Sequence, residues 1–275
     1  MKYRLSACAI MKNEQKNVLE WVAYHHAIGV DHFYIYDNDA NSGMDRILNK
    51  YIDAGIVDLI YFPGTVQQLP AYNDCLARFR EESKYIAFID ADEFLIPIKD
   101  VNVANLVDEI IEGYRSKDLG VAGLGVNWKI YGWGGYSSRP EGLVIENYLH
   151  VQNSPRDNHI KSIVDPRKVN MFPNPHFCSY IEQYYTIDET GRKLSGPFNN
   201  RQPRDKIRIN HYYYKSEEDF KGRIERKRSD MLRTTEQMIS TINSELAELR
   251  NSDKEYDPIM LRYVDRVKEE IQRFS

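Results

Sequence analysis

Two aspartates separated by one residue follow a short apolar run in the segment IAFIDADEF, at positions 90 and 92. If the chain turns directly after a buried strand, the carboxylates of Asp90 and Asp92 can both face one crevice. Hard divalent cations prefer oxygen ligands and bridge readily to the oxygens of a diphosphate. The pair therefore indicates a metal site. A solvated turn without a metal is the alternative that the same residues allow.

One histidine lies in a setting that suits the same chemistry. His211 follows the strand-like stretch 206–209 and precedes three tyrosines and Lys215. Neutral imidazole is a common metal ligand. A lone histidine is more often a structural residue, so the residues by themselves leave both interpretations open.

The elements that must position these side chains alternate between strands and helices over the first hundred residues. Apolar, aromatic and β-branched runs predict strands at 4–11, 32–36, 57–62 and 85–89. Helical spacing predicts helices at 13–28, 44–54 and 72–83. This alternation is typical of an α/β protein with a mostly parallel sheet flanked by helices.

Polar groups stand at the places where such a sheet binds ligands. In open α/β sheets the crevice lies beyond the carboxyl ends of the strands. This chain carries acid or amide groups after three of its predicted strands, at 12–14, 37–39 and 90–92. The sequence therefore predicts one ligand site at this edge of the sheet.

The rest of the chain divides into an irregular middle and a charged tail. Residues 120–210 are rich in glycine, proline, asparagine and aromatic residues, with short strand candidates at 123–128 and 143–148. Residues 216–275 have helical spacing. We expect a main domain over 1–215 and a C-terminal helical extension over 216–275.

The composition of the chain excludes some classes of protein function. The chain has 275 residues, of which 42% are hydrophobic, and 37 basic against 41 acidic residues give a net charge of −4. That balance excludes a globally basic nucleic-acid coat protein. No apolar run approaches the roughly 20 residues that cross a bilayer, and three cysteines without a CxxC pair fit a reducing compartment. We expect a cytoplasmic protein, either free or peripheral to the inner face of the membrane.

Several segments together resemble a known family. The residues KNE at 12–14, the stretch EWVAYHHAIGVDHFYIYDNDANSG, the segment IAFIDADEFL and the later INHYYYKSEEDF are similar to glycosyltransferase family 92, a relative of the large family 2. The resemblance implies the GT-A fold. It also implies inverting transfer of a sugar from a nucleotide sugar, usually a UDP-sugar, to a saccharide acceptor, with Mn²⁺ or Mg²⁺. The pathway it implies is polysaccharide or lipopolysaccharide biosynthesis.

Carried over position by position, the resemblance implies a set of site residues. The nucleotide sugar would meet Asn13, Glu14, Asp37, Asn38, Asp90 and Lys215, the last of them at the diphosphate. The metal would be held by Asp90, Asp92 and His211. Two further polar residues ahead of the fourth predicted strand, Gln68 and Asn73, could border the nucleotide or serve only as helix or loop residues.

Sugar transfer also needs a base that deprotonates the acceptor hydroxyl, and a carboxylate is the usual group. Glu141 is our first candidate and Glu146 the second, with a structural role for both as the alternative. Flat aromatic faces suit the apolar side of a sugar ring. The predicted acceptor-binding residues are accordingly Trp128, Tyr131 and Trp133.

Some polar segments have two interpretations, and for the basic run the solvated helix face is the favoured one. The residues His159, Lys161, Arg167 and His176 belong either to a loop that closes over a diphosphate or to a solvated loop. The basic run FKGRIERKRSDMLR fits contact with anionic lipid, for a lipid-linked acceptor, or a solvated helix face. The tail helices fit a homodimer contact or packing on the main domain.

Two other function classes use the same acidic pair. A metal-dependent phosphohydrolase or nucleotidyltransferase usually has more acidic ligands or a glycine-rich phosphate loop, and neither GxxxxGK[ST] nor GxGxxG occurs here. The other class is a non-catalytic module that binds a nucleotide or a carbohydrate.

Overall fold

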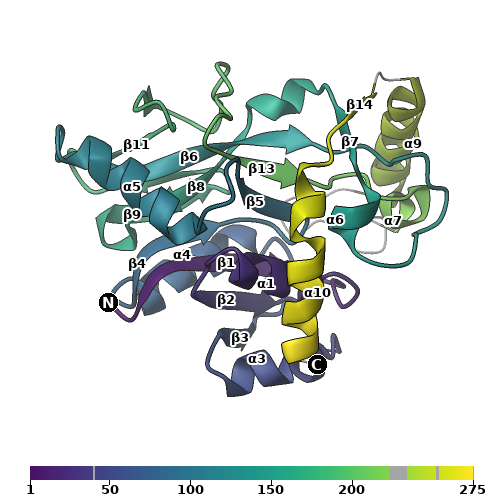
Figure 1. The fold of residues 1–275 in the computed structure, drawn as a ribbon, viewed down its shortest axis with the longest axis horizontal. Helices are drawn as coiled ribbons and strands as arrows, with labels where there is room; N and C mark the ends of the chain where they lie inside the picture. The colour runs from purple at the N-terminus through teal and green to yellow at the C-terminus, as the bar shows by residue number, and fades with distance from the viewer. Residues whose placement is uncertain (40, 223–233, 252–253, 275) are drawn as a thin grey trace.

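The computed structural model describes residues 1–39, 41–222, 234–251 and 254–274, and its centre is a ten-stranded sheet (Figure 1). The strand order is β12-β11-β6-β8-β4-β1-β2-β3, and β13 pairs with both β6 and β5. The strands of this sheet are β1 (Tyr3–Met11), β2 (His32–Asp37), β3 (Val57–Tyr61), β4 (Ser83–Phe88), β5 (Glu93–Pro97), β6 (Val121–Ile130), β8 (Ile160–Val164), β11 (Tyr185–Ile187), β12 (Lys193–Leu194) and β13 (Ile207–His211).

Four of these strands, β3, β2, β1 and β4, form a parallel block, so their carboxyl ends share one edge. The predicted α/β class with a mostly parallel sheet is confirmed. The strand β8 runs antiparallel between β4 and β6, which the sequence did not predict. Two small sheets complete the strands: β9 (Val169–Asn174) with β10 (Phe177–Tyr180), and β7 (His150–Gln152) with β14 (Lys254–Tyr256).

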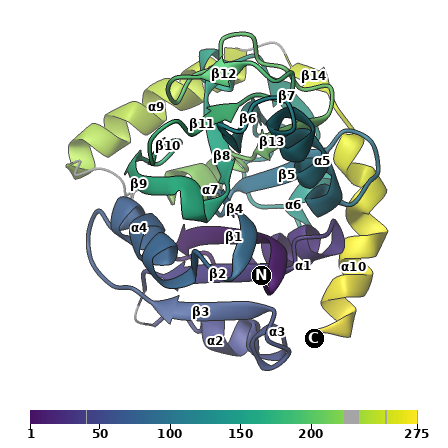
Figure 2. The ribbon, with the colours of Figure 1, turned by 90° about the vertical axis from the view of Figure 1, so that its left-hand side faces the viewer.

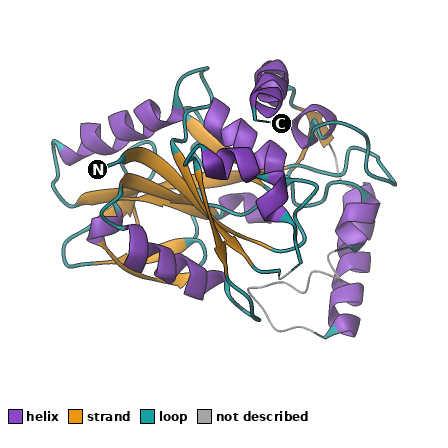
Figure 3. Ribbon diagram, turned by 90° about the horizontal axis from the view of Figure 1, so that it is seen from below, coloured by secondary structure: helices purple, strands orange, loops and turns teal. Residues whose placement is uncertain are grey.

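Helices cover both faces of the twisted sheet (Figures 2 and 3). In Figure 2, α4 lies on one side and α1, α5 and α10 lie on the other. The α-helices are α1 (Val18–Ala27), α2 (Met44–Ile47), α3 (Asn49–Asp53), α4 (Gln68–Phe79), α5 (Val103–Arg115), α6 (Val144–Asn147), α7 (Glu217–Lys221), α9 (Thr235–Asn251) and α10 (Val264–Arg273). Three 3₁₀ helices are η1 (Pro155–Asn158), η2 (Pro166–Lys168) and η3 (Ile259–Tyr263).

Successive side chains of β1 alternate between the two hydrophobic cores, which lie on opposite faces of the sheet. Ala7 and Ala9 face the larger core with α1 and α5, while Cys8 and Ile10 face the smaller core with α4. Successive residues of a strand point to opposite faces, so a strand buried on both sides must be apolar throughout. This explains why the central strands read as continuous apolar runs.

Several predicted boundaries need correction. The helix predicted from residue 13 begins at Val18, because Asn13 has a φ of 54° and the chain turns there. The helix predicted at 72–83 covers Gln68–Phe79, and the one at 44–54 is two short helices. The strand candidate at 143–148 was wrong: it is α6, because Glu20 accepts two amides at the start of this segment and caps it as a helix.

The C-terminal segment returns to the main domain. Helix α10 packs along α1, as Figure 1 shows, and His26 lies 2.5 Å from the carboxylate of Glu270. Strand β14 pairs with β7. Most of the basic run at 220–233 lies outside the described residues. No helix of the described part is long and apolar enough to cross a membrane.

Candidate active site

The predicted metal ligands Asp92 and His211 lie side by side. Strand β13 pairs antiparallel with β5, with His211 opposite Glu93, and the amide of Tyr212 donates to the carbonyl of Asp92 at 2.8 Å. As a result, Nε2 of His211 lies 3.4 Å from Oδ1 of Asp92. Residues that are 119 positions apart thus meet because one strand pair fixes their backbones.

The other predicted ligand, Asp90, has protein partners on both oxygens. Its Oδ1 accepts hydrogen bonds from Nε2 of Gln68 at 2.7 Å and from the hydroxyl of Tyr72 at 3.1 Å. Its Oδ2 lies 2.9 Å from Nζ of Lys161, whose side chain is fully buried. The antiparallel register of β8 against β4 brings Lys161 level with the end of β4, so an internal cation neutralises the first carboxylate of the pair.

A third carboxylate, that of Glu93, belongs to this cluster. The sequence did not lead us to predict Glu93 as a site residue. Its side chain is fully buried, its Oε2 accepts the amide of Asp90 at 2.9 Å, and Nζ of Lys161 lies 3.8 Å away. Burial raises the pKa of Glu93 well above its ordinary value. Burial acts to lower the pKa of Lys161, but Asp90 and Glu93 raise it more. The ammonium therefore stays charged between carboxylates.

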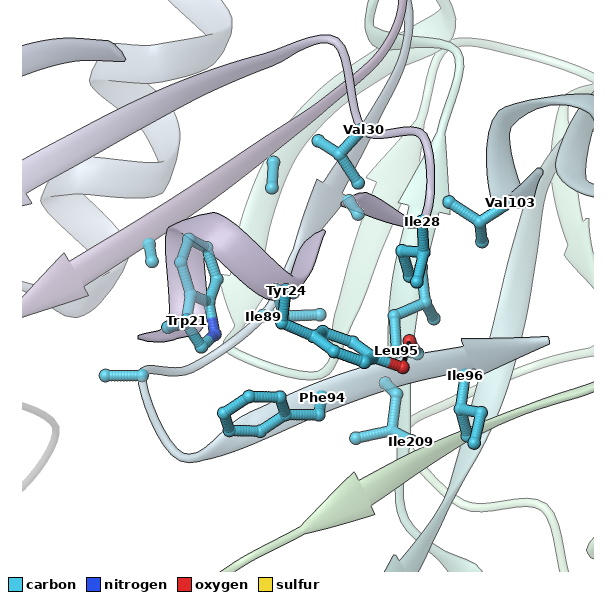
Figure 4. Close-up of a cluster of buried hydrophobic side chains, with 14 of the residues drawn as sticks. Trp21, Tyr24, Ile28, Val30, Ile89, Phe94, Leu95, Ile96, Val103 and Ile209 are labelled. Atoms are coloured by element: carbon cyan, nitrogen blue, oxygen red, sulfur yellow. Dashed lines mark hydrogen bonds between the residues drawn. The ribbon is translucent and has the colours of Figure 1, made fainter. Parts of the chain in front are cut away.

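The aromatic core holds the turn that carries these acids. The indole N–H of Trp21 donates to the carbonyls of Glu93 at 2.9 Å and Asp90 at 3.2 Å. The hydroxyl of Tyr24 donates to the carbonyl of Leu95 at 2.9 Å. Figure 4 shows Trp21 and Tyr24 of α1 directed toward the start of β5. Helix α1 thus fixes the backbone from which the acidic side chains project.

Asp92 and His211 are suitable ligands for a divalent cation whose remaining ligands come from the substrate. Asp92 and His211 offer one oxygen and one nitrogen ligand at a common point. Within the described ranges, no three His, Cys, Asp or Glu side chains are grouped so that they could hold a metal by themselves. A cation here would take Asp92 and His211 as protein ligands and diphosphate oxygens as the rest, as Mg²⁺ sites on phosphates commonly do.

The ends of β1 and β2 hold predicted nucleotide-binding residues in defined positions. The amide of Asn38 donates to the carbonyl of Met11 at 2.8 Å, which joins the two strand ends. The side-chain amide of Asn38 donates to Phe62 at 2.7 Å, while its Oδ1 is buried without a partner among the described residues. Burial raises the pKa of Asp37, and Ser42 and the Asp39 amide donate to its carboxylate. The unpartnered oxygen of Asn38 is suited to an N–H group of a ligand.

The other residues predicted to bind the nucleotide differ in their contacts. Gln68 joins the acidic cluster through Asp90. Asn73 does not: its side chain bonds the backbone of Phe172 in both directions, at 2.8 and 3.1 Å, and so ties α4 to β9. Asn13 is exposed at the turn after β1, and Glu14 is buried with its carboxylate 2.5 Å from Nδ2 of Asn17.

The two candidate bases lie on one segment but differ in their contacts. Glu146 accepts the amide of Leu143 at 2.8 Å and forms an ion pair with Lys268 at 2.6 Å. Partial burial acts to raise the pKa of Glu146, but these two donors lower it below its ordinary value. Glu141 is exposed. Because Glu146 already has two partners, Glu141 remains the better candidate.

The segment with Glu141 and Glu146 is attached by side-chain contacts to helix α1 and to the turn that precedes it. The guanidinium of Arg139 donates to Oδ1 of Asn17 at 2.7 Å and lies 3.6 Å from Asp219 of α7. The carboxylate of Glu20 accepts the amides of Val144 at 2.8 Å and Ile145 at 3.0 Å. The loop with Glu141 is therefore attached at both ends to elements beside the site.

Burial raises the pKa of Glu20 from its ordinary value of 4.5 to about 7, although the Val144 and Ile145 amides and the charge of Lys215 act to lower it. The predicted diphosphate residue Lys215 is itself buried, with a φ of 53°, and lies near enough to Glu20 for this electrostatic effect.

The raised pKa of Glu20 predicts a specific pH dependence of stability. Between about pH 4.5 and 7 the folded protein keeps a proton that the unfolded chain has lost. The stabilising contribution is complete below the unfolded pKa and is lost as the pH rises through the folded pKa. Calorimetry of wild type and Glu20→Gln should show that the wild type gains relative stability from about pH 7.5 to about pH 5. A melting-temperature difference that is constant over this window would contradict the assignment.

The predicted acceptor-binding aromatics are mostly covered. Tyr131 is fully buried, and its hydroxyl accepts hydrogen bonds from Arg208 and Asn210 at 3.1 Å each, so its ring presents no face to a ligand. Trp133 is half-buried against the larger core. Trp128 is buried with its ring 4.3 Å from that of His211. The ring of Trp128 thus packs against the imidazole of the candidate metal ligand His211.

A cleft of about 530 Å³ opens next to the acidic cluster. Its wall includes Gln68, which bonds Asp90, and the imidazoles of His159 and His176. Both rings contact Trp128, at centroid distances of 4.9 and 5.0 Å. Arg167, which was considered with these residues, instead forms an ion pair with Asp165 at 2.8 Å. The cleft is therefore separated from Asp90 by one side chain, that of Gln68, and from His211 by two, an imidazole of the wall and Trp128.

Comparison with known proteins adds a decisive finding. The profile of glycosyltransferase family 92 matches residues 3–250. The chain belongs to glycosyltransferase family 92. A family 92 protein of Ricinus communis is 26% identical over 228 residues, which cover 82% of this chain and 38% of that protein. One of Oryza sativa subsp. japonica is 27% identical and covers 81% and 35%. The chain spans well under half the length of these relatives.

Two of the similar proteins are galactosyltransferases. A β-1,4-galactosyltransferase of Caenorhabditis elegans is 29% identical over 110 residues, which cover 35% of this family 92 chain and 26% of that protein. A galactan β-1,4-galactosyltransferase of Arabidopsis thaliana is 31% identical and covers 35% and 21%. Among solved structures, TarS of S. aureus in complex with UDP has a TM-score of 0.38 at 13% identity and covers 60% of this chain and 47% of that one.

Proposed function

We propose that this family 92 chain is a metal-dependent, inverting glycosyltransferase that moves a sugar from a UDP-sugar to a saccharide acceptor. The observation that supports it most directly is the meeting of Asp92 and His211, 3.4 Å apart, beside the neutralised Asp90. The sequence-based expectations of a polysaccharide or lipopolysaccharide pathway, a cytoplasmic or peripheral location and a homodimer stay predictions.

The proposed mechanism gives a role to the cation, to its two protein ligands, to Asp90 and to Glu141. Bound Mn²⁺ or Mg²⁺ supplies positive charge that stabilises the departing diphosphate. Asp92 and His211 would hold that cation, while Asp90, whose carboxylate is fixed by Lys161 and Gln68, would face the donor. Glu141 would take the proton of the acceptor hydroxyl as that oxygen attacks the anomeric carbon from the side opposite the diphosphate. A single displacement of this kind inverts the anomeric configuration.

A screen of nucleotide sugars tests the proposal. Two similar proteins are galactosyltransferases, so UDP-galactose is the first donor to include. The assay follows released UDP or GDP with and without Mn²⁺, and mass spectrometry of added oligosaccharides detects transfer. We expect Mn²⁺-dependent release from one UDP-sugar. Phosphate release from simple phosphoesters without any sugar transfer would favour the phosphohydrolase class instead, and nucleotide binding without turnover would favour a binding module.

The base assignment is tested by two matched variants on the same segment. Glu141→Gln should leave UDP binding unchanged and lower transfer by about 10²–10⁴-fold, because it removes proton acceptance in the transition state. Glu146→Gln should retain most transfer activity, because Glu146 caps α6 and pairs with Lys268. Steady-state rates with saturating donor decide between them. The reverse pattern would make Glu146 the base.

A further inference from the structure

Among the described residues that line the cleft of about 530 Å³ beside the acidic cluster, none carries a full charge. Its lining consists of Val66, Gln68, Leu69, Pro70, His159, Asn174, Pro175, His176, Pro197 and Phe198. Burial lowers the pKa of His159 and, together with the charge of Lys161, lowers that of His176 to about 2, so both imidazoles are neutral at pH 7. A phosphate group would find no cation on this wall, so the cleft suits an uncharged ligand.

The wall combines flat apolar surface with a few hydrogen-bonding groups. The side chain of Phe198 is 54% exposed, an uncommon state for a phenyl ring, and its edge-to-face contact with His159 has a centroid distance of 4.7 Å. Gln68 and Asn174 add amide groups. A pyranose ring has an apolar C–H face that packs on an aromatic ring and hydroxyls that need hydrogen-bond partners. The lining matches both needs.

Backbone bonds hold Phe198 in place. The amide of Ile160 donates to the carbonyl of Pro197 at 3.1 Å, and the amide of Asn199 donates to the carbonyl of Asn158 at 2.7 Å. Phe198 itself forms a β-bridge with His159. The exposed ring is thus carried on a segment paired to the start of β8, as a binding platform requires.

Two local features indicate that this region is kept for a ligand. On the opposite wall, Val66 has a φ of 56°, a left-handed conformation that β-branched residues avoid and that persists mainly at functional sites. Behind the histidine wall, the indole N–H of Trp128 is buried and has no hydrogen-bond partner among the described residues. Buried polar groups of proteins are normally paired, so an unpaired N–H directly behind this wall is an unusual feature of the region.

The position of the cleft favours the acceptor over the donor. The diphosphate of the donor needs the cation that Asp92 and His211 would hold, and its nucleoside is expected at the ends of β1 and β2. Neither of these strands contributes a residue to the cleft. The acceptor must approach the anomeric carbon next to the diphosphate, and the cleft adjoins Asp90 through Gln68. We propose that this cleft binds an uncharged sugar ring of the acceptor, with Phe198 as the ring on which it stacks; this rests on the proposed function.

Binding to a printed array of neutral and acidic oligosaccharides tests this site without any need for turnover. We expect the wild type to bind neutral glycans and Phe198→Ala to lose about tenfold in affinity, the value of one aromatic contact. Phe198→Tyr keeps the flat ring and should retain binding. Tyr256→Ala is the matched control, because Tyr256 is 57% exposed but belongs to β14, away from the cleft.

The outcomes separate this inference from the proposed function. Binding confined to acidic glycans, or neutral-glycan binding that Phe198→Ala leaves unchanged, would overturn the acceptor assignment. Thermal shift with UDP and Mn²⁺ is measured on the same variants. If Phe198→Ala abolishes the UDP shift, the cleft holds the donor and the inference is wrong while the proposed function stands. If UDP shifts no variant but Phe198→Ala still loses glycan binding, the site stands and the proposed function fails.

Discussion

Asp92→Asn should lower metal-dependent sugar transfer by about 100-fold or more, because one of only two protein ligands of the proposed cation is lost. The amide side chain has the same shape but no charge. The backbone carbonyl of Asp92, rather than its carboxylate, accepts the Tyr212 amide, so the strand pair that positions His211 should remain. Released UDP measured over a range of Mn²⁺ concentrations gives the effect.

Control variants make this result specific. Asp108→Asn removes a carboxylate from a partly exposed ion pair with Lys84 and should leave transfer unchanged. His211→Ala should resemble Asp92→Asn, since it removes the other ligand. Full activity of Asp92→Asn at ordinary Mn²⁺ concentrations would show that Asp92 is not a ligand.

Lys161→Met should lower the free energy of unfolding by about 3–5 kcal/mol, because removal of the ammonium leaves the fully buried carboxylate of Glu93 and the partly exposed carboxylate of Asp90 without compensation. Lys161 and Glu93 are fully buried, and Lys161 lies 2.9 Å from Asp90. Urea unfolding monitored by circular dichroism measures the change. Sugar transfer should fall as well, because Asp90 loses the contact that orients it.

A double-mutant cycle separates the ion pair from simple loss of packing. The double variant Lys161→Met with Asp90→Asn should recover part of the stability, since it removes charge from both partners. Lys84→Met is the matched control: its ion pair with Asp108 is partly exposed, so we expect a loss of about 1 kcal/mol or less. A Lys161→Met protein as stable as the wild type would show that the buried pair is not needed for the fold.

The parallel half of the fold could be predicted from sequence because its signals are local. Buried parallel strands read as continuous apolar runs, and the polar residues that follow them fall at one edge of the sheet. The position of Asp90 at the end of β4 follows from this pattern alone. The convergence of Asp92 and His211 was expected only from the family resemblance, because no local rule pairs β13 with β5.

The parts that could not be predicted depend on long-range pairing. Strand β8 is a short run in an irregular region, and its antiparallel insertion between β4 and β6 is what buries Lys161 against Asp90. A lysine is normally exposed, so the sequence predicted Lys161 in a loop, either closing over a diphosphate or solvated, and not in a buried strand. Likewise, α6 is a helix because Glu20, from a distant helix, caps its amides. Glu93 gave one usable signal, an acid directly after DxD at the start of an apolar strand.

In the proposed mechanism, Asp92 and His211 hold a divalent cation that anchors the diphosphate of the donor. Thermal unfolding with UDP and Mn²⁺ together, compared with UDP and EDTA, tests it directly in the wild type and in Asp92→Ala. At UDP about 100-fold above its Kd, we expect a rise in Tm of about 5 °C that needs Mn²⁺ and is absent in Asp92→Ala. An equal rise in EDTA, or in Asp92→Ala with Mn²⁺, would contradict it.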